Sequence, residues 1–415
     1  MIPRWLILAD DRSGAADAGV AFARRGHATE VRWDDAWAED GLAVLALDLD
    51  SRAATAAEAA ARHGDAVRRA VRPERRLFKK IDSTLRGQPA AELAAIAAAL
   101  RERGLPSWGL LAPANPAMRR TTRDGRVFVD GALLEDTVTW NREHSYPDAD
   151  LAAIARSAGL HAISLPLAAL RGDDSAVRHA FLAAAASGAT ADTILIGDAE
   201  TDGDLDRLVA AARAWPPGFF AGTAGLANAL ARTLPGKPTA RPRFAPTSRG
   251  TLVAVGSAAP VSREAARRLA THDRAHLVSI TLASPAGHSA VNAQVAADIG
   301  ARLAYGDTVV ALLDGPEVAS GALDSGYLRS FAAALADGLG RMGALVVTGG
   351  ETASALLAQC KVHGIRLLDE LEPGVALGLT RGAVEVPLVT KPGAFGDEHS
   401  LRRCLDALHA LRPTA

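Results

Sequence analysis

The sequence predicts two α/β domains with largely parallel sheets. Short apolar runs, each about the length of a buried strand, alternate with Ala-rich stretches of helix-forming composition. This alternation is typical of parallel strands joined by crossover helices. The chain has 415 residues, of which 49% are hydrophobic, so it is long enough to bury two separate cores.

The first half of the chain holds the first series of this pattern. Buried strands are predicted at residues 5–9, 43–47, 110–112 and 193–196. A helix-forming stretch follows each run. Residues 127–134 predict a β-hairpin with Asp130-Gly131 at its turn, because this pair tolerates the left-handed backbone of tight hairpin turns.

Four prolines, at positions 235, 238, 242 and 246, interrupt this rhythm. Closely spaced prolines in a polar stretch are typical of a linker. We therefore predict a first domain at 1–234, a linker at 235–250 and a second domain at 251–415. The second domain repeats the pattern, with strands predicted at 251–255, 276–280, 308–312 and 345–347. Two such domains predict a ligand cleft between them.

The composition argues against several classes of protein. The formal net charge is −1 and aromatic residues make up 4%, which does not suit binding to nucleic acid or to an anionic membrane. The apolar run at 5–9 is too short for a signal-peptide core, and no stretch reaches transmembrane length. Cys360 and Cys404 lie far apart, without metal-ligand spacing. We therefore expect a cytoplasmic protein with two reduced thiols.

Polar residues follow the first two predicted strands. The segment Asp10-Asp11-Arg12-Ser13-Gly14 comes directly after the first, at the strand end where open α/β folds bind ligands. Adjacent carboxylates there can bind a hydroxylated ligand, hold Mg²⁺ or act as a base. Alternatively, Asp11 or Ser13 simply caps the next helix. Arg52, just after the second strand, can bind a ligand carboxylate through two hydrogen bonds.

The richest segment is Lys79-Lys80-Ile81-Asp82-Ser83-Thr84-Leu85-Arg86-Gly87. It carries two lysines, an aspartate, two hydroxyls and an arginine. A run of charges is usually a solvated surface, but this run interrupts apolar strand context. It also combines the groups that recognise an oxygen-rich anion. The segment therefore predicts a binding site for such a ligand.

Three turns that contain glycine follow predicted strands in the second half. They are Gly256-Ser257, Gly349-Gly350-Glu351-Thr352 and the segment from Lys391 to Gly396. Free backbone N–H groups at a helix start favour phosphate. Each turn alone could instead serve tight packing of a strand on a helix, but three in one domain favour a nucleotide site. None matches the P-loop or Rossmann glycine pattern.

These segments, in this order, resemble those of the four-carbon acid sugar kinase family, bacterial enzymes once grouped as a domain of unknown function. The resemblance covers nearly the whole chain. It rests on residues 10–14, 80–87, 198–202, 225–226, 256–257, 349–352 and 391–396. Three positions differ from the usual family residue: Ser13 replaces Thr, Thr223 replaces Ser and Ala394 replaces Gly. None of these changes removes a charged group.

The resemblance implies a kinase that uses ATP to phosphorylate threonate, erythronate or 3-oxo-tetronate. It also implies an N-terminal substrate domain and a C-terminal nucleotide domain. The residues expected to hold the sugar acid are Asp10, Asp11, Arg52, Lys80, Asp82, Ser83, Thr84, Leu85 and Arg86. The residues expected to hold ATP are Ser257, Gly349, Gly350, Glu351, Thr352, Lys391, Gly393 and Gly396. Mg²⁺ is expected to bridge phosphate oxygens, and no residue is assigned as its ligand.

Catalysis and partners are predicted on the same basis. Either Asp11 or Asp82 is expected to accept the proton of the reacting hydroxyl. We expect the domains to close on sugar acid and ATP, without nucleic acid or membrane as partners, and a homodimer is an open option. The cations of the first-half segments give an excess of positive charge, which predicts an acidic substrate bound by Arg52 or Arg86.

Two other functions fit parts of the pattern. A Mg²⁺-dependent phosphatase built around Asp10 would have Asp-x-Asp after the first strand, where this chain has Arg12. A two-domain protein that binds a sugar acid without catalysis would not need three glycine turns in its second half. Formation of ADP distinguishes this binding protein from a kinase.

Overall fold

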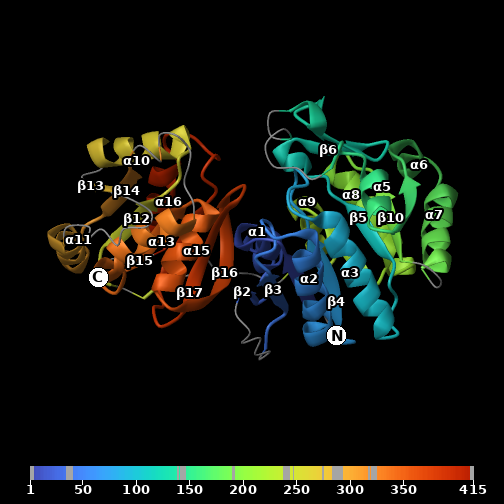
Figure 1. Ribbon diagram of the computed structural model, residues 1–415, viewed down its shortest axis with the longest axis horizontal. Helices are drawn as coiled ribbons and strands as arrows, with labels where there is room; N and C mark the ends of the chain where they lie inside the picture. The colour runs from blue at the N-terminus through green and yellow to red at the C-terminus, as the bar shows by residue number, and fades with distance from the viewer. Residues whose placement is uncertain are drawn as a thin grey trace. The chain divides into compact units, whose positions relative to one another are not determined.

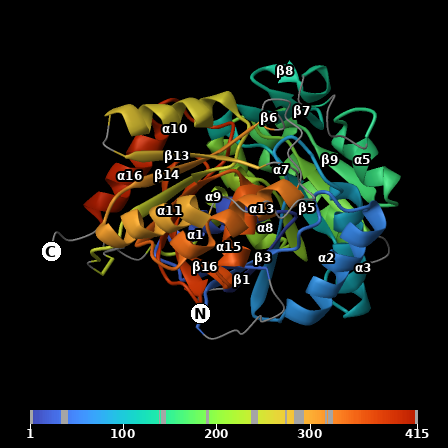
Figure 2. The same cartoon turned by 60° about the vertical axis from the view of Figure 1, so that its left-hand side comes forward.

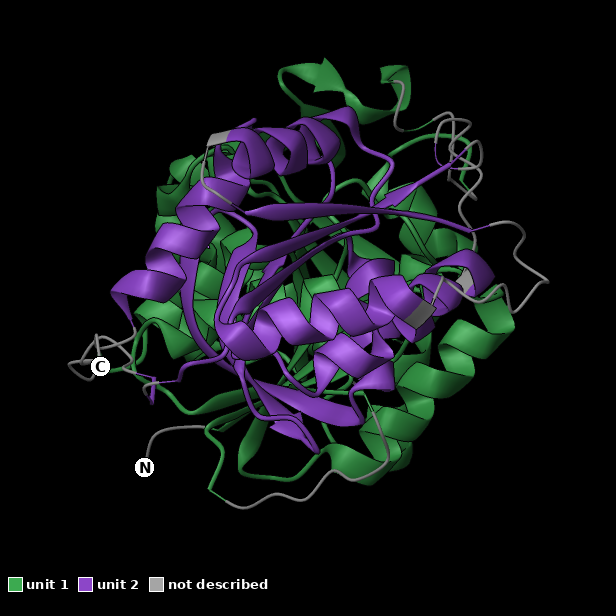
Figure 3. Cartoon of the chain, turned by 90° about the vertical axis from the view of Figure 1, so that its left-hand side faces the viewer, with its two compact units in different colours: residues 1–238 green, residues 239–415 purple. Residues whose placement is uncertain are grey.

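The computed structural model describes residues 4–33, 41–137, 140, 146–188, 192–236, 244–245, 247–272, 275–282, 293–315, 318 and 325–411. The chain divides into two compact units, residues 1–238 and 239–415, which Figure 3 shows in separate colours. Each unit is an α/β structure, as the sequence predicts (Figure 1). In the described part of the chain, no helix combines the length and the apolar composition that crossing a bilayer requires.

Unit 1 is built on parallel strands in the order β2-β3-β1-β4-β11-β5-β10-β9. Their bounds are β1 (Arg4–Ala9), β2 (Thr29–Arg32), β3 (Val44–Asp48), β4 (Arg75–Lys80), β5 (Gly109–Ala112), β9 (His161–Leu165), β10 (Thr193–Gly197) and β11 (Phe219–Gly222). Every neighbouring pair is parallel. The carboxyl ends of β3, β1 and β4 therefore meet at one edge, where ligands of such sheets bind.

Helices cover both faces of this sheet, since consecutive strand residues face opposite sides. Leu6 of β1 packs in a core with Val67 and Ile96 of α2 and α3. The ring of the neighbouring Trp5 packs at a tilt against that of Phe22 of α1, with ring centroids 5.4 Å apart. The helices are α1 (Arg12–Ala23), α2 (Ala56–Ala70), α3 (Pro89–Glu102), α5 (Leu151–Ser157), α6 (Leu167–Arg171), α7 (Asp174–Ser187), α8 (Asp202–Ala214) and α9 (Ala224–Arg232).

A small antiparallel sheet in unit 1 contains the predicted hairpin. Its strands are β6 (Arg120–Arg123), β7 (Arg126–Val129) and β8 (Ala132–Leu133), flanked by the 3₁₀ turns η1 (Pro116–Met118) and η2 (Leu134–Asp136). β7 pairs with β8, and the turn residues Asp130 and Gly131 have φ values of 53° and 87°. Both values are left-handed, as the turn chemistry of Asp-Gly predicts. The hairpin prediction is confirmed.

Unit 2 has the strand order β13-β14-β12-β15-β18-β17-β16. The strands are β12 (Thr251–Val255), β13 (His276–Thr281), β14 (Val309–Asp314), β15 (Ala344–Thr348), β16 (Val362–Glu372), β17 (Val375–Gly382) and β18 (Pro387–Lys391). The first five in this order are parallel. β17 pairs antiparallel with both β18 and β16, and the sequence did not predict this antiparallel extension.

Helices cover both faces of the unit 2 sheet (Figure 2). α10 and α16 pack with β12, β14 and β15 in one core, and α11, α13 and α15 lie on the other face. The helices are α10 (Pro260–His272), α11 (Ala293–Tyr305), α13 (Ser325–Ala334), α14 (Ala336–Leu339), α15 (Gly350–Gln359) and α16 (Ser400–Ala410).

The predicted linker at 235–250 lies partly outside the described residues, which leave out 237–243 and 246. Phe244, within the predicted linker, is buried in the core of unit 2. Its amide donates to the carbonyl of Leu411 at 3.0 Å. Phe244 therefore packs as part of unit 2.

Candidate functional site

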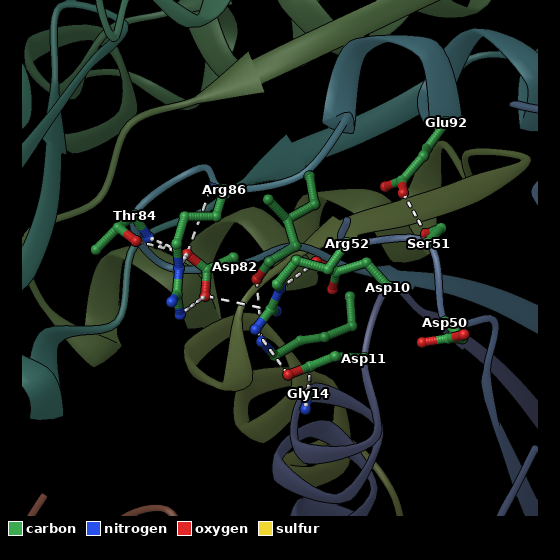
Figure 4. Close-up of polar contacts among 12 residues, drawn as sticks. Asp10, Asp11, Gly14, Asp50, Ser51, Arg52, Asp82, Thr84, Arg86 and Glu92 are labelled. Atoms are coloured by element: carbon green, nitrogen blue, oxygen red, sulfur yellow. Dashed lines mark hydrogen bonds and ion pairs between the residues drawn. The ribbon is translucent and has the colours of Figure 1, made fainter. Parts of the chain in front are cut away.

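Three loops at adjacent strand ends bring charged side chains of unit 1 together (Figure 4). Asp10 directly follows β1, while Arg52 and Asp82 lie shortly after β3 and β4. The loops after β1 and β3 are joined through the backbone, because the amides of Ser51 and Arg52 both donate to the carbonyl of Asp10, at 2.9 and 3.1 Å. Residues from three separate motifs thus form one cluster.

Arg52 lies at the centre of this cluster. Its Nε donates to Asp10 Oδ2 at 2.8 Å and its Nη1 donates to Asp11 Oδ2 at 2.7 Å. Its Nη2 lies 3.6 Å from Asp82 Oδ1. One guanidinium can serve three carboxylates because its donors form a planar fork. The side chain of Arg52 is 25% exposed and that of Asp10 only 2%, so the cluster is buried on one side and open to solvent on the other.

The carboxylate of Asp82 is saturated with hydrogen bonds. It accepts from Thr84 Oγ1 at 2.5 Å, and from Nε and Nη2 of Arg86, both at 3.0 Å. Burial acts to raise the pKa of Asp82, but the hydrogen bonds from Arg86 and the charges of Arg52 and Arg86 outweigh it and hold the pKa well below its usual value. A carboxylate so strongly stabilised as the anion is a weak base.

Asp11 has a different environment. Its Oδ1 accepts from the amide of Gly14 at 2.7 Å and caps α1, so the helix-cap interpretation is confirmed. Burial raises the pKa of Asp11, and the adjacent charge of Asp10 adds to this, against the opposing charge of Arg52. Because Asp11 is also 25% exposed, it is better suited than Asp82 to accept a proton from a ligand.

The two lysines of β4 point to opposite faces of the sheet, because they are consecutive in the strand. Lys79 is fully buried, and its Nζ lies 2.8 Å from Glu92 Oε2 of α3. Lys80 faces α1, where its Nζ lies 3.5 Å from Asp17 Oδ2 and donates to the carbonyl of Ile81 at 3.0 Å. Of these two lysines, only Lys80 is among the residues that the sequence assigns to the site.

The remaining predicted residues of this loop have unequal access to a ligand. Ser83 is partly exposed. Leu85 is buried in the core and has a left-handed φ of 61°, so only its backbone is available to a ligand. Gly87 allows the close approach of Asp10, since an added Cβ would lie 3.2 Å from Asp10 Oδ2.

The expected excess of positive charge in this region is wrong. Arg52, Lys79, Lys80 and Arg86 are all paired with acids, which are Asp10, Asp11, Asp17, Asp82 and Glu92. Four cations thus face five carboxylates. Counting charges within the motifs failed because Asp17 and Glu92 lie on helices outside them.

In unit 2, the three glycine turns meet at the carboxyl ends of the neighbouring strands β12, β15 and β18. A Cβ added to Gly393 would lie 2.1 Å from Ser257 Oγ, and one added to Gly256 would lie 2.5 Å from Thr352 Oγ1. The amide of Gly349 donates to the carbonyl of Lys391 at 2.8 Å. The structure thus brings together three turns that the sequence singled out separately.

The turn after β15 exposes the start of α15. Its N-cap residue Gly349 has a φ of 90°, which favours glycine. No side chain caps this helix within the described part of the chain. Gly350, Glu351 and Thr352 form its first turn, where uncapped amides favour an anion such as phosphate. Glu351 is exposed, whereas Thr352 is buried.

The buried side chain of Lys391 makes hydrogen bonds at the third turn, from Lys391 to Gly396. Its buried Nζ donates to Ser262 Oγ and to the carbonyl of Pro392, both at 3.0 Å. Ser262 Oγ in turn donates to the carbonyl of Gly393 at 2.6 Å. Burial lowers the pKa of Lys391. The exposed Gly396, with a φ of 81°, ends the same turn.

Substitution of Gly393 by alanine should weaken nucleotide binding. The new Cβ would lie 2.1 Å from Oγ and 2.9 Å from Cβ of Ser257, so it would push two turns apart. If this displacement removes one hydrogen bond between a turn and a phosphate, the KM for the nucleotide should rise about 10-fold. Gly340→Ala is the control, since an added Cβ there meets no atom within 4 Å. Equal nucleotide KM values in the two variants would contradict the assignment of these turns to nucleotide binding.

The sequence did not predict Ser51 and Glu92, two residues that contact each other behind the charged cluster. Ser51 Oγ donates to Glu92 Oε1 at 2.6 Å, and Glu92 also pairs with Lys79. One signal for Glu92 was available, because it lies four residues before Ile96 and eight before Leu100. A carboxylate on the buried stripe of an Ala-rich helix requires a buried partner.

Comparisons with known proteins cover both units. Residues 5–230 match a family model described as a sugar-binding N-terminal domain, and residues 252–401 match one described as a nucleotide-binding C-terminal domain. The chain is 38% identical to a D-threonate kinase of Cupriavidus necator, over 97% of this chain and 98% of that one. It is 32% identical to a D-threonate kinase of Bordetella bronchiseptica, over 98% of each chain.

A solved structure from Salmonella typhimurium shares the fold, with a TM-score of 0.77, 21% identity and coverage of 97% of this chain and 98% of that one. The family models and the kinase relatives, which match nearly the whole length, confirm the resemblance found in the sequence. The chain therefore belongs to the four-carbon acid sugar kinase family, a family of phosphotransferases.

Proposed function

We propose that the chain is an ATP-dependent kinase that phosphorylates a hydroxyl of a four-carbon sugar acid, with D-threonate as the first candidate. The observation that carries this proposal is the pairing of two different sites in one chain. Unit 1 has a cluster of carboxylates and guanidinium groups suited to a hydroxylated ligand, and unit 2 has three glycine turns suited to phosphate. Two full-length relatives named D-threonate kinase support the choice of substrate.

Phosphoryl transfer depends on positioning and charge stabilisation more than on covalent chemistry. In this proposal, Asp10, Asp82 and Arg52 orient the sugar acid through its hydroxyls and carboxylate. Asp11 accepts the proton of the attacking hydroxyl, because its raised pKa makes it the stronger base of the candidate pair. Arg86, whose side chain is 34% exposed, is available to the carboxylate of the ligand.

Unit 2 is proposed to bind ATP with Mg²⁺. Among the described residues, no group of three His, Cys, Asp or Glu side chains forms a metal site. Mg²⁺ is often held by one or two carboxylates together with phosphate oxygens and water. Glu351 and Asp397 are the carboxylates within or next to the three turns. Bound Mg²⁺ would neutralise charge on the phosphates.

The acid group of the substrate should matter. A charged hydrogen bond between a guanidinium and the carboxylate is worth roughly 2–3 kcal/mol, about 30- to 150-fold in kcat/KM. D-threonate should therefore exceed threitol, its neutral counterpart, by at least about 30-fold. Steady-state kinetics with both compounds checks this expectation. Equal kcat/KM values for the acid and the alcohol would contradict recognition of the carboxylate.

A coupled assay of ADP release tests the function itself. The panel should contain D-threonate, D-erythronate, 3-oxo-tetronate and longer hydroxy acids, each with ATP and Mg²⁺. We expect the highest kcat/KM with a four-carbon acid. A preference for a five- or six-carbon acid would overturn the proposed substrate class, and absence of ADP release with every acid would overturn the kinase proposal.

A further inference from the structure

A buried polar network behind the charged cluster connects α3 to the loop of Arg52. Glu92, in the first turn of α3, is 2% exposed. Its Oε1 accepts from Ser51 Oγ at 2.6 Å, and its Oε2 lies 2.8 Å from Lys79 Nζ. Figure 4 shows Glu92 and Ser51 joined in this way beside Arg52. Neither Ser51 nor Glu92 belongs to the residues predicted to touch a ligand.

The charge of Glu92 is balanced by Lys79 alone among the neighbours described. His63 Nδ1 lies 3.8 Å from Glu92 Oε1, but the same nitrogen lies 3.0 Å from the carbonyl of Ala59. Burial, followed by the charge of Lys79, lowers the pKa of His63 to about 4. His63 is therefore neutral near pH 7, and Lys79 is the cation that pairs with Glu92 in the described structure.

A buried ion pair is a poor source of stability. Removing two charges from water costs several kcal/mol per ion, and apolar side chains of similar size often stabilise a core equally well or better. The same face of α3 already carries apolar residues such as Leu93 and Ile96. Core packing therefore does not explain a carboxylate at position 92. We interpret the Lys79–Glu92 pair as one that positions neighbouring residues.

The contacts of Glu92 indicate that the positioned segment is the loop that carries Ser51 and Arg52. Ser51 and Arg52 follow Asp50, whose φ of 47° is left-handed. The amide of Asp50 donates to Asp48 Oδ1 at 2.9 Å. The hydroxyl of Ser51 is a buried side-chain contact between this loop and α3. The guanidinium of Arg52 extends from the next residue toward Asp10, Asp11 and Asp82.

Lys79 of β4 lies in register with Leu8 of β1, so its side chain lies on the same side of the sheet as that of Asp10, two residues after Leu8. Asp10 Oδ2 accepts from Arg52, while its buried Oδ1 has no hydrogen-bond partner in the described structure. Burial raises the pKa of Asp10, but the charges of Arg52 and Lys79 outweigh it. Lys79 therefore stabilises the anionic form of Asp10 from the interior, and Glu92 fixes the position of Lys79.

We infer that Glu92 is a positioning residue of the sugar-acid site, acting through Ser51 on Arg52 and through Lys79 on Asp10. This inference rests on the proposed function for its substrate. It does not require that Glu92, Ser51 or Lys79 touch the sugar acid.

Ser51→Ala tests the first connection in the full-length enzyme. It removes one hydroxyl and leaves the buried charges paired. We expect the KM for D-threonate to rise about 10-fold, the scale of one lost hydrogen bond, while the KM for ATP stays within about twofold. The control Ser107→Ala removes another buried serine hydroxyl of unit 1, which bonds to the carbonyl of Gly188 at 3.4 Å, and should change neither KM.

The double variant Glu92→Gln with Lys79→Met tests the second connection without leaving an unpaired buried charge. It should raise the KM for D-threonate at least about as much as Ser51→Ala, since it disturbs Asp10 as well. A lower melting temperature with both KM values unchanged in the two variants would identify the network as merely structural and overturn the inference.

A crystal structure of Ser51→Ala gives a readout that needs no substrate. We expect the guanidinium of Arg52 to shift, with a longer hydrogen bond to Asp10 or Asp11, and unchanged contacts would overturn the inference. If the wild-type chain turns over no four-carbon acid, the proposed function fails, and this structure still decides whether the network positions Arg52.

Discussion

Asp11→Asn should lower kcat by about 100-fold or more, the usual scale for loss of a general base. Asparagine is nearly isosteric and is as good an N-cap as aspartate, so the start of α1 should stay intact. The KM for the sugar acid should change far less than kcat, because Arg52 keeps its hydrogen bond to Asp10 while the amide oxygen of the new side chain caps α1. Steady-state kinetics of the purified variant, with its melting temperature as a check on folding, measures this effect.

The pH profile adds an independent test of the same residue. Burial raises the pKa of Asp11 above its ordinary value of 3.8, so a growing fraction of Asp11 is protonated as the pH falls. A protonated carboxyl accepts no proton, and kcat of the wild type should decrease on the acid side. Asp11→Asn should lack this decrease. If Asp82→Asn instead loses kcat while Asp11→Asn keeps it, the base is Asp82.

Arg52→Lys should lower kcat/KM for the sugar acid by about 100-fold or more. An ammonium is a compact charge and cannot reproduce a planar fork that contacts Asp10, Asp11 and Asp82 together. Losing one or two charged hydrogen bonds, each worth about 1.5–3 kcal/mol, accounts for a change of this size. The variant keeps the formal charge, so the effect reports geometry.

Arg171→Lys is a matched control for this variant. Arg171 in α6 also makes a two-pronged pair with a carboxylate of unit 1, donating to Asp204 Oδ1 and Oδ2 at 2.8 and 2.7 Å. It lies outside the residues assigned to the site, so kcat/KM should stay within about threefold of the wild type. An Arg52→Lys enzyme that is as active as Arg171→Lys would contradict the central role of Arg52.

Much of the fold could be predicted from local patterns. The apolar runs at 5–9, 110–112 and 251–255 all fall within parallel strands, because strands buried on both faces are apolar without interruption. The long strand β16 was missed. It mixes charged and apolar residues and contains register shifts against β17, so its sequence has no regular period of two.

The motifs of the site were visible in the sequence, but their pairing was not. Asp10, Arg52 and Asp82 stand at strand ends, which predicts a common edge. Asp82 accepts the strongest hydrogen bonds because Thr84 and Arg86 lie close to it. The spacing of residues in the sequence does not reveal these distances. The partners Asp17 and Glu92 lie inside helices, where a single acid is ordinarily a surface residue, so the charge balance became clear only from the structure.

Transfer of a labelled phosphoryl group tests the account most directly. The full-length enzyme is incubated with D-threonate, Mg²⁺ and ATP labelled in the γ-phosphate, and the products are separated and identified by mass spectrometry. We expect the label to appear in a phosphate ester of the four-carbon acid, with one ADP formed per ester. Label found only in ATP and inorganic phosphate, with the acid unmodified, would contradict it.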